Sequence, residues 1–373
     1  MLHIVVLGGG RVGSAMARDL APDFRVTVAD RSDEALARLA AAGIATRKAD
    51  LASPAGVQTA VADADLVVGA VPGFMGFATA KAVLEAGKTL VDISFFDEDC
   101  FELDALAKAR NLTAVVDCGI APGCGNIILG DAARRWDRVT RFECLVGGLP
   151  VLRTWPYEYK AGFSPIDVIE EYTRPARYVR EGHTITLPAL SEPELLDFPG
   201  LGTLESFNTD GLRSLIHSFP EVPDMKEKTL RYPGHIEKMR MLRESGFFRK
   251  DRIRVGDAEV SPLDLTTALL FPLWFMNEGD EDFTVMRVTV EGIQAGRSAR
   301  IELNLLDRYA PATRTTSMAR TTGYTATAAV RLVASGGFTR KGISPPEAIG
   351  RTPGGWDFVR AELAKRNVVF REA

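Results

Sequence analysis

The first 120 residues alternate between short apolar runs and segments in which apolar residues recur every three to four positions. The run His3–Leu7 is followed by three glycines and then by Val12, Met16 and Leu20 at a spacing of four. This change of period predicts a strand, a tight turn and a helix. Further strands are predicted at residues 25–30, 45–50, 65–71, 89–94 and 113–119, and helices at residues 32–42, 53–64, 77–86 and 100–110.

Strands that alternate with helices in this way predict an α/β fold, a doubly wound parallel sheet of the Rossmann type. Beyond Ile120 the strands become longer and alternate polar with apolar positions, and from about Ala319 the pattern is helical again. The middle part predicts an α+β second domain on a largely antiparallel sheet. We expect a Rossmann domain at 1–122, a substrate-binding domain at 123–318, and helices at 319–373 that return to the Rossmann domain.

Composition narrows the classes of partner. The chain has 373 residues and a formal net charge of −4, with 46% hydrophobic and 25% charged residues. Such a balance offers no basic surface for nucleic acid or membranes. No apolar run reaches the roughly 18 to 20 residues that a membrane helix needs, and the cysteines lack CxxC spacing. No cluster has metal-ligand spacing. We expect a cytoplasmic protein whose partners are small molecules and copies of itself.

A glycine motif between the first predicted strand and helix fits the dinucleotide signature GxGxxG. In that context Gly8 would form the turn, Gly10 would let a pyrophosphate approach, and Gly13 would allow close packing of helix on strand. Asp30, at the end of the second strand, could accept hydrogen bonds from a ribose, which favours NAD, while Arg31 leaves NADP as an alternative. The predicted cofactor residues of this region are Gly8, Gly10, Arg11, Val12, Gly13, Asp30 and Arg31.

Ligands of such sheets bind outside the carboxyl ends of the strands. Three predicted strand ends carry polar or turn-forming residues: 70–72, 92–94 and 117–119. Asp92 and Asp117 are candidate catalytic acids, with helix capping as the alternative. The glycines between Pro122 and Asn126 open another predicted helix, which could bind an anion or act as a hinge. The residues expected to line the nicotinamide half are Ala70, Val71, Pro72 and Ser94.

Several motifs of the chain resemble the saccharopine dehydrogenase superfamily, and the resemblance covers nearly the whole sequence. Within the superfamily the resemblance is strongest to the lysine 6-dehydrogenase subgroup. The motifs are DCGIAPGCGNI, LVGGLP, EYKAGFSPIDVIEEYTRPARYVREG, LESFNTDGLRSL, KTLRYPGHIEKM, SMARTTGYTATAAVRLVASG and KGISPPE.

This resemblance implies NAD-dependent oxidation of the ε-amine of L-lysine. The product would be 2-aminoadipate 6-semialdehyde, which cyclises to piperideine-6-carboxylate, and ammonia would be released. Saccharopine and carboxynorspermidine enzymes, which share the architecture and act on secondary amines, are the first alternative. They usually have Asp-Pro-Gly where this chain has Ala121-Pro122-Gly123, and this departure argues against them. A non-catalytic dinucleotide-binding sensor is the second alternative. The resemblance also implies a dimer that pairs through the second domain.

Amine oxidation requires a neutral nitrogen, whereas a lysine ammonium has a pKa of about 10.4, so a base or a desolvating pocket is needed. His235 is the candidate base because it follows a Pro-Gly turn at a predicted helix start, which lowers the pKa of an imidazole. An N-cap role is the alternative. A substrate carboxylate requires arginine, for which Arg213 and Arg231 are candidates, with a solvated charge as the alternative. Glu205 and Asp210 are candidates for the α-ammonium, and the resemblance alone adds Tyr159, Ser164 and Tyr172.

Overall fold

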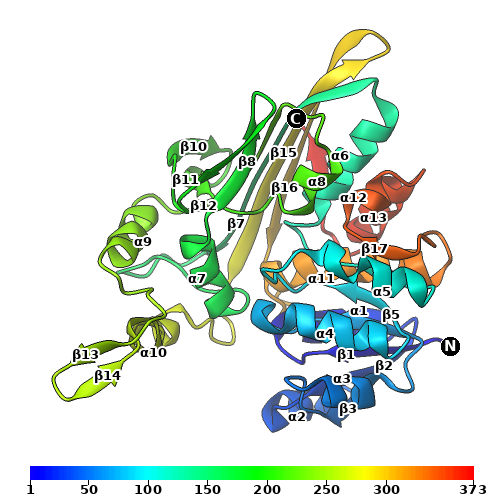
Figure 1. Cartoon of the computed structure of the whole chain (residues 1–373), viewed down its shortest axis with the longest axis horizontal. Helices are drawn as coiled ribbons and strands as arrows, with labels where there is room; N and C mark the ends of the chain where they lie inside the picture. The colour runs from blue at the N-terminus through cyan, green and yellow to red at the C-terminus, as the bar shows by residue number, and fades with distance from the viewer. The chain divides into compact units, whose positions relative to one another are not determined.

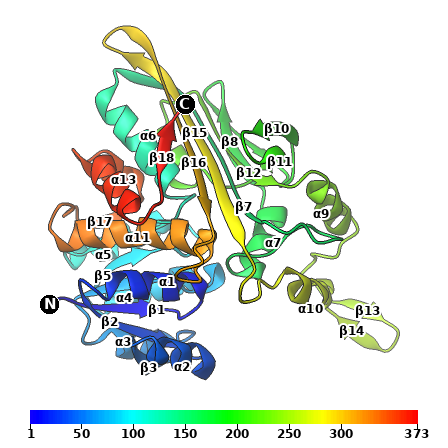
Figure 2. The ribbon, with the colours of Figure 1, turned by 180° about the vertical axis from the view of Figure 1, so that it is seen from behind.

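The computed structural model describes residues 1–373, which divide into two compact units. Unit 1 comprises Met1–Val139, Gly292–Ala299 and Met318–Phe370, and unit 2 comprises Thr140–Glu291, Arg300–Ser317 and Arg371–Ala373. Each unit therefore combines segments that are distant in the sequence, as the chain colours in Figures 1 and 2 show.

Unit 1 contains a seven-stranded sheet with the order β17-β6-β5-β4-β1-β2-β3. All neighbouring strands run parallel, so the predicted Rossmann sheet is confirmed. The strand β17 was not predicted, and its place at the edge is fixed by Asp104, whose carboxylate accepts a hydrogen bond from the backbone of Ile343 at 2.9 Å. The strands are β1 His3–Leu7, β2 Arg25–Asp30, β3 Ala45–Lys48, β4 Leu66–Gly69, β5 Thr89–Asp92, β6 Thr113–Val115 and β17 Gly342–Ser344.

Helices connect these strands, and two of them begin at serine caps. The hydroxyls of Ser32 and Ser53 accept hydrogen bonds from the third residue after each cap, at 3.2 and 3.1 Å, which satisfies a backbone N–H of the first turn. The segment 100–110 is a 3-10 turn followed by a helix shorter than predicted, and α4 begins at Gly73 instead of Phe77. The helices are α1 Arg11–Leu20, α2 Asp33–Ala41, α3 Pro54–Val61, α4 Gly73–Glu85, η1 Cys100–Leu103, α5 Asp104–Ala109, α6 Cys124–Arg135, α11 Ser317–Ala334, α12 Glu347–Gly350 and α13 Gly355–Lys365.

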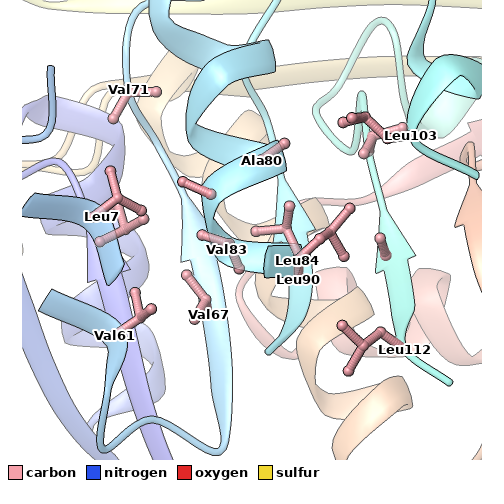
Figure 3. Close-up of a cluster of buried hydrophobic side chains, with 14 of the residues drawn as sticks. Leu7, Val61, Val67, Val71, Ala80, Val83, Leu84, Leu90, Leu103 and Leu112 are labelled. Atoms are coloured by element: carbon pink, nitrogen blue, oxygen red, sulfur yellow. The ribbon is translucent and has the colours of Figure 1, made fainter. Parts of the chain in front are cut away.

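The core of unit 1 lies between the sheet and its helices. Leu7, Val67 and Leu90 from three neighbouring strands are buried together with Val83 and Leu84 of α4 (Figure 3). Complete burial of each such side chain stabilises a fold by about 1.5 to 3 kcal/mol. This packing fixes the positions of the strand ends at which the candidate residues lie.

Unit 2 is built on a nine-stranded mixed sheet. The pairs β10–β11, β11–β12, β8–β12 and β8–β9 are antiparallel, as predicted, but β12 runs parallel to β7, with Asp224 opposite Arg141. The order is β10-β11-β12-β7-β15-β16-β18, with β8 paired to β12 and to β9. The strands are β7 Arg138–Pro150, β8 Ala176–Arg180, β9 His183–Leu187, β10 Glu194–Phe198, β11 Gly202–Asn208, β12 Asp224–Arg231, β15 Asp282–Gln294, β16 Arg297–Arg308 and β18 Phe370–Glu372.

Short helices and one separate hairpin complete unit 2. The helix α10 continues to Trp274 and contains Pro272. None of the helices in the chain is both long enough and apolar enough to cross a membrane. The helices are α7 Pro165–Thr173, α8 Ser214–Ser218, α9 His235–Glu244 and α10 Pro262–Trp274, and the hairpin strands are β13 Ile253–Val255 and β14 Ala258–Val260.

Candidate functional site

The glycine loop after β1 leaves room for atoms only where a ligand would need it. A Cβ atom at Gly8 would lie 2.4 Å from the carbonyl oxygen of Ala70, and one at Gly13 would lie 2.0 Å from that of Gly8. Gly8 also has a φ of 108°, which disfavours other residues. At Gly10, by contrast, a Cβ atom would meet nothing within 4 Å. The loop is closely packed on the protein side and open beside Gly10, as pyrophosphate binding requires.

The N terminus of α1 follows directly from this loop. The first turn contains no acidic residue, and the N-cap residue Gly10 contributes no side-chain oxygen. The hydroxyl of Ser14 donates to the carbonyl of Gly9 at 2.9 Å, which fixes the loop against the helix. A helix N terminus without a carboxylate or cap is suited to bind an anion. Arg11 and Val12 are the first two residues of this helix, each half-buried.

Asp30 ends β2 beside the loop. One carboxylate oxygen accepts a hydrogen bond from the backbone of Gly9 at 2.6 Å, and the other accepts one from Ser32 at 2.7 Å. A carboxylate has about four acceptor positions, so acceptor capacity remains for ribose hydroxyls. Arg31 is exposed. Arg38, which the sequence did not single out, donates to the carbonyl of Gly9 at 3.4 Å and brings a second cation to the loop.

The ends of β4 and β5 meet through Ser94. Its hydroxyl lies 3.1 Å from the carbonyl oxygen of Val71 and 3.0 Å from the carboxylate of Asp92. Asp92 is almost fully buried and also accepts the backbone N–H of Ser94 at 2.9 Å. These contacts form a turn and not a helix cap. Pro72, the N-cap residue of α4, is half-buried.

Asp117 lies at the end of the neighbouring strand β6, buried and with a φ of 54°. The backbone N–H of Cys118 donates to the carbonyl of Asp92 at 2.9 Å, so the structure brings the two aspartates to adjacent strand ends. Burial raises the pKa of the Cys118 thiol, and Cys124, Asp117 and Asp92 raise it further. Burial likewise raises the pKa of Cys124 to about 12. Both thiols are therefore protonated at neutral pH.

The glycine-rich start of α6 is occupied by its own residues. The backbone of Gly123 donates to the Asn126 side chain at 3.1 Å, and the Asn126 amide donates to Glu347 at 3.2 Å. A Cβ atom at Gly123 would lie 1.6 Å from the carbonyl oxygen of Gly119. This geometry makes the segment a closely packed junction and gives no support to the predicted anion site.

In unit 2, His235 is buried at the beginning of α9. Its Nδ1 lies 2.8 Å from the carbonyl oxygen of Tyr157, and its Nε2 lies 2.9 Å from the hydroxyl of Tyr172. A carbonyl only accepts, so Nδ1 carries the proton and Nε2 accepts from the tyrosine. The alternative of an N-cap role is wrong, because Gly234 is the N-cap residue and the imidazole bonds elsewhere.

The pKa of His235 is lowered to about 3. Burial is the largest cause and the nearby charge of Arg231 the second, while the hydrogen bond to Tyr157 opposes them. The sequence analysis also expected a lowered pKa for His235, but it named the helix start as the cause, whereas burial is the largest cause. The imidazole is uncharged at neutral pH.

Arg231, at the end of β12, is the centre of the same cluster. Its Nη2 donates to the carboxylate of Glu171 at 2.5 Å, and its Nε donates to the hydroxyl of Tyr172 at 3.1 Å. Its guanidinium also lies 4.6 Å from the centre of the Tyr159 ring. Burial raises the pKa of Glu171, against the opposing effect of Arg231. Burial alone would lower the pKa of Arg231, but Tyr172, Tyr159 and Glu171 raise it overall.

Four predicted site residues thus come together: the substrate candidates Tyr159, Tyr172 and Arg231 and the candidate base His235. Glu205 reaches the same turn, because its carboxylate accepts the backbone N–H of Gly234 at 3.0 Å. Asp210 instead forms a bidentate ion pair with Arg177, with both distances 2.8 Å. Arg213 lies half-buried before α8 and Ser164 half-buried before α7.

Sequence reasoning missed Glu171 and Trp274. Glu171 precedes Tyr172 in the sequence, yet its partner Arg231 is 60 residues away. The Trp274 ring packs against Tyr159 and Tyr172 with centroid distances of 5.5 and 6.3 Å. A helical position next to a predicted tyrosine was the available signal for Glu171. The residues next to Glu171 and Trp274 in the sequence do not indicate that Glu171 pairs with Arg231 or that Trp274 packs on the two tyrosines.

The low pKa of His235 leads to a prediction about stability. An unfolded histidine has a pKa of about 6.5 and the folded one a pKa of about 3, so the unfolded state binds more protons between these values. Stability contributed by the neutral imidazole is present above pH 6.5 and is lost as the pH falls toward 3, at about 1.4 kcal/mol per pH unit. We expect His235→Asn to flatten this slope in denaturant titrations at several pH values.

The exposed His183 of β9 provides the matched control. The His183→Asn variant should show the same dependence of the free energy of unfolding on pH as the protein without substitutions. Equal slopes for His235→Asn and the unchanged protein would contradict the buried, uncharged imidazole.

Two domain models of one protein family match nearly the whole chain. Residues 4–115 match the saccharopine dehydrogenase NADP binding domain, and residues 117–368 match the saccharopine dehydrogenase C-terminal domain. The chain belongs to the saccharopine dehydrogenase family. The cofactor of this family member is a nicotinamide dinucleotide, in agreement with the loop around Gly10.

Individual relatives are distant from this family member. Mitochondrial alpha-aminoadipic semialdehyde synthase of Bos taurus is 24% identical over 218 residues, which are 54% of this chain and 23% of that protein. The NADP(+), L-glutamate-forming saccharopine dehydrogenase of Pyricularia oryzae is 25% identical over 261 residues, 65% of this chain and 57% of that protein. The matched regions are thus only part of these relatives' lengths.

One solved structure has the same fold over its whole length. The apo form of the L-Glu-forming saccharopine dehydrogenase from Saccharomyces cerevisiae superimposes with a TM-score of 0.80. The alignment covers 100% of this chain and 99% of the yeast chain, at 19% sequence identity. At this identity the likeness concerns the fold alone.

Proposed function

We propose that this protein is an NAD(P)-dependent oxidoreductase that acts on the carbon–nitrogen bond of an amino-acid amine, with L-lysine as substrate. The glycine loop carries the cofactor part of this proposal, because Gly8 and Gly13 admit no side chain while the space beside Gly10 is open. The family supports the amine-oxidising reaction, and lysine is proposed from the resemblance. When bound, the nicotinamide ring accepts hydride from the carbon that bears the amine. The amides at the start of α1 would hold the pyrophosphate, and Asp30 would hold the ribose.

We propose NAD as the preferred cofactor. The Asp30 carboxylate is held toward the loop by Gly9 and Ser32, and it would repel a 2′-phosphate. Arg31 and Arg38 are the residues that would favour NADP, since both are cations close to Asp30 in sequence or space.

For the substrate, we propose that Arg231 binds the α-carboxylate and that Glu171 handles the proton of the ε-ammonium. A guanidinium has five N–H donors. Three of those of Arg231 donate to the Glu171 carboxylate, the Tyr172 hydroxyl and the Leu230 carbonyl, and the others would donate to the α-carboxylate. His235 is then a positioning residue, because an imidazole with a pKa of about 3 does not accept a proton from an ammonium at neutral pH. Asp117 is the candidate acid of unit 1.

A saccharopine-type reaction on a secondary amine is the second candidate. It is favoured by the name of a relative, the L-glutamate-forming saccharopine dehydrogenase of Pyricularia oryzae. Ala121 favours lysine instead, because the acid that those enzymes usually offer to the substrate amine is missing from this chain.

We also propose that the protein is a cytoplasmic homo-oligomer.

The test is a turnover assay that follows the absorbance of the reduced cofactor. NAD and NADP are each supplied with L-lysine, saccharopine, ornithine or a simple amino acid. We expect reduction with lysine and NAD, and a catalytic efficiency at least about tenfold lower with NADP, equal to about 1.4 kcal/mol. Activity with saccharopine but not lysine would replace the first candidate by the second. Cofactor binding without any turnover would indicate a sensor.

A further inference from the structure

The peptide between Gly9 and Gly10 is the part of the glycine loop that its own residues constrain least. Glycine has no Cβ atom and adopts both positive and negative φ angles, so a peptide between two glycines can rotate at little cost. One orientation presents its N–H to the open space beside Gly10, and the opposite orientation presents its carbonyl oxygen there. Only the first orientation attracts an anion. Contacts from outside the loop must therefore select it.

Ser14 on α1 holds this peptide from the inner side. Its hydroxyl donates to the carbonyl of Gly9 at 2.9 Å, and its backbone N–H donates to the carbonyl of Gly10 at 2.8 Å. Ser14 is buried, whereas Gly10 is exposed. One residue thus turns two successive carbonyl groups of the loop toward the interior.

The hydroxyl contact differs from the usual one of a serine in a helix. A helical serine that bonds to the backbone reaches a carbonyl three or four residues earlier, inside the same helix. Ser14 instead reaches five residues back to Gly9, which precedes the N-cap residue Gly10. The bond therefore adds nothing within α1 and joins the helix to the loop before it.

Gly9 has two further contacts that act in the same direction. Arg38 of α2 donates to its carbonyl at 3.4 Å, and a carbonyl oxygen has two lone pairs, so it can accept both donors. The N–H of Gly9 donates to the carboxylate of Asp30 at 2.6 Å. The carbonyl of Gly9 is therefore held by a buried hydroxyl on α1 and by an exposed guanidinium on α2.

We propose that Ser14 is a positioning residue of the dinucleotide site. A trans peptide directs its C=O and its N–H to opposite sides, so the bond from Ser14 directs the N–H of Gly10 away from the interior, toward the open space beside it. No group of the protein accepts that N–H, and a phosphate oxygen of the cofactor would accept it. The inference deepens the cofactor part of the proposed function and does not depend on which amine is oxidised.

The experiment compares two ligands that differ in the pyrophosphate. ADP-ribose contains it and adenosine does not, while both contain the adenine and the ribose that Asp30 would hold. Ser14→Ala removes only the hydroxyl, and alanine is the best helix former, so α1 keeps its structure. In calorimetric titrations we expect the dissociation constants for ADP-ribose and NADH to rise about tenfold, as for a lost hydrogen bond. The dissociation constant for adenosine should stay within about twofold.

Arg38→Met tests the outer half of the contact. Because Ser14 and Arg38 donate to the same oxygen, the double variant should lose more ADP-ribose affinity than the two single losses combined, since the carbonyl of Gly9 then has no donor and the peptide can rotate. Arg31→Met is the control for charge, because it removes an exposed cation next to Asp30 that has no bond to Gly9. Its effect should add to that of Ser14→Ala without coupling.

Thr113→Val is the matched control for the loss of a buried hydroxyl. Thr113 of β6 is buried and donates to the backbone carbonyl of Arg340 at 2.9 Å, the same distance as the Ser14 bond. This variant should lower the melting temperature and leave the affinity for both ligands unchanged. Equal losses for ADP-ribose and adenosine in Ser14→Ala, or an ADP-ribose affinity within twofold of the unsubstituted protein, would overturn the proposal. These titrations need no substrate, so their outcome is separate from that of the turnover assay.

Discussion

Replacing Arg231 with methionine is expected to lower the free energy of unfolding by roughly 3 to 5 kcal/mol, the range for loss of one partner of a buried ion pair. The half-buried Glu171, whose side chain is 18% exposed, would be left without its cation, and its pKa, already raised by burial, would rise further. The Tyr172 hydroxyl would also lose the donor at 3.1 Å. Denaturant titration at neutral pH measures the change.

The pH dependence distinguishes this cause from a packing defect. An acid whose folded pKa lies above its unfolded value binds more protons when folded, so the variant should regain stability as the pH falls through the pKa of Glu171. Adding Glu171→Gln to the Arg231 variant should remove most of the loss at neutral pH. Arg180→Met, in an exposed pair with Glu192, is the control and should have a much smaller effect. An equal loss at every pH would contradict the uncompensated carboxylate.

Adding a methyl group at Gly10 is expected to reduce dinucleotide affinity about a hundredfold, or about 3 kcal/mol, without a loss of thermal stability. The backbone at Gly10 has φ −66° and ψ −169°, which alanine adopts easily, and a Cβ atom there meets no protein atom within 4 Å. The methyl would instead occupy the space that the pyrophosphate needs. Titration with reduced cofactor and a melting curve measure the two effects separately.

Gly13→Ala is the contrasting variant. Its Cβ atom would lie 2.0 Å from the carbonyl oxygen of Gly8, and because this neighbour is backbone, the loop must move. We expect both the melting temperature and the cofactor affinity to fall. Affinity within twofold of the unchanged protein for Gly10→Ala would show that the pyrophosphate does not approach the loop at this residue.

Local patterns were sufficient to predict most of unit 1. The run His3–Leu7, the glycine loop and the helix after it follow each other in the structure as in the pattern, because period and turn residues act over a few positions. The helix starts near residues 32 and 53 were readable for the same reason, and in the structure both serines are N-caps. The strand β17 could not be predicted, because its three residues GIS show no hydrophobic period. Its formation depends on contacts with β6 and Asp104.

The cluster in unit 2 was predicted only in part. Tyr159, Tyr172, Arg231 and His235 were candidates through resemblance and residue chemistry, and the structure brings them together. Their hydrogen bonds and charges could not be predicted, because the low pKa of His235 arises mainly from burial and from Arg231, which precedes its helix and is placed beside it by the fold. Whether these residues contact a substrate stays a prediction.

The sequence by itself determined the Rossmann sheet, the glycine loop and the place of His235 at a helix start, because turn chemistry and hydrophobic period are local properties. Only the tertiary structure decided that Glu171 neutralises Arg231 and that Asp210 pairs with Arg177. The physical reason is that desolvation and ion pairing depend on which side chains meet in the folded chain. These side chains are far apart in the sequence, so no single segment reveals their contacts.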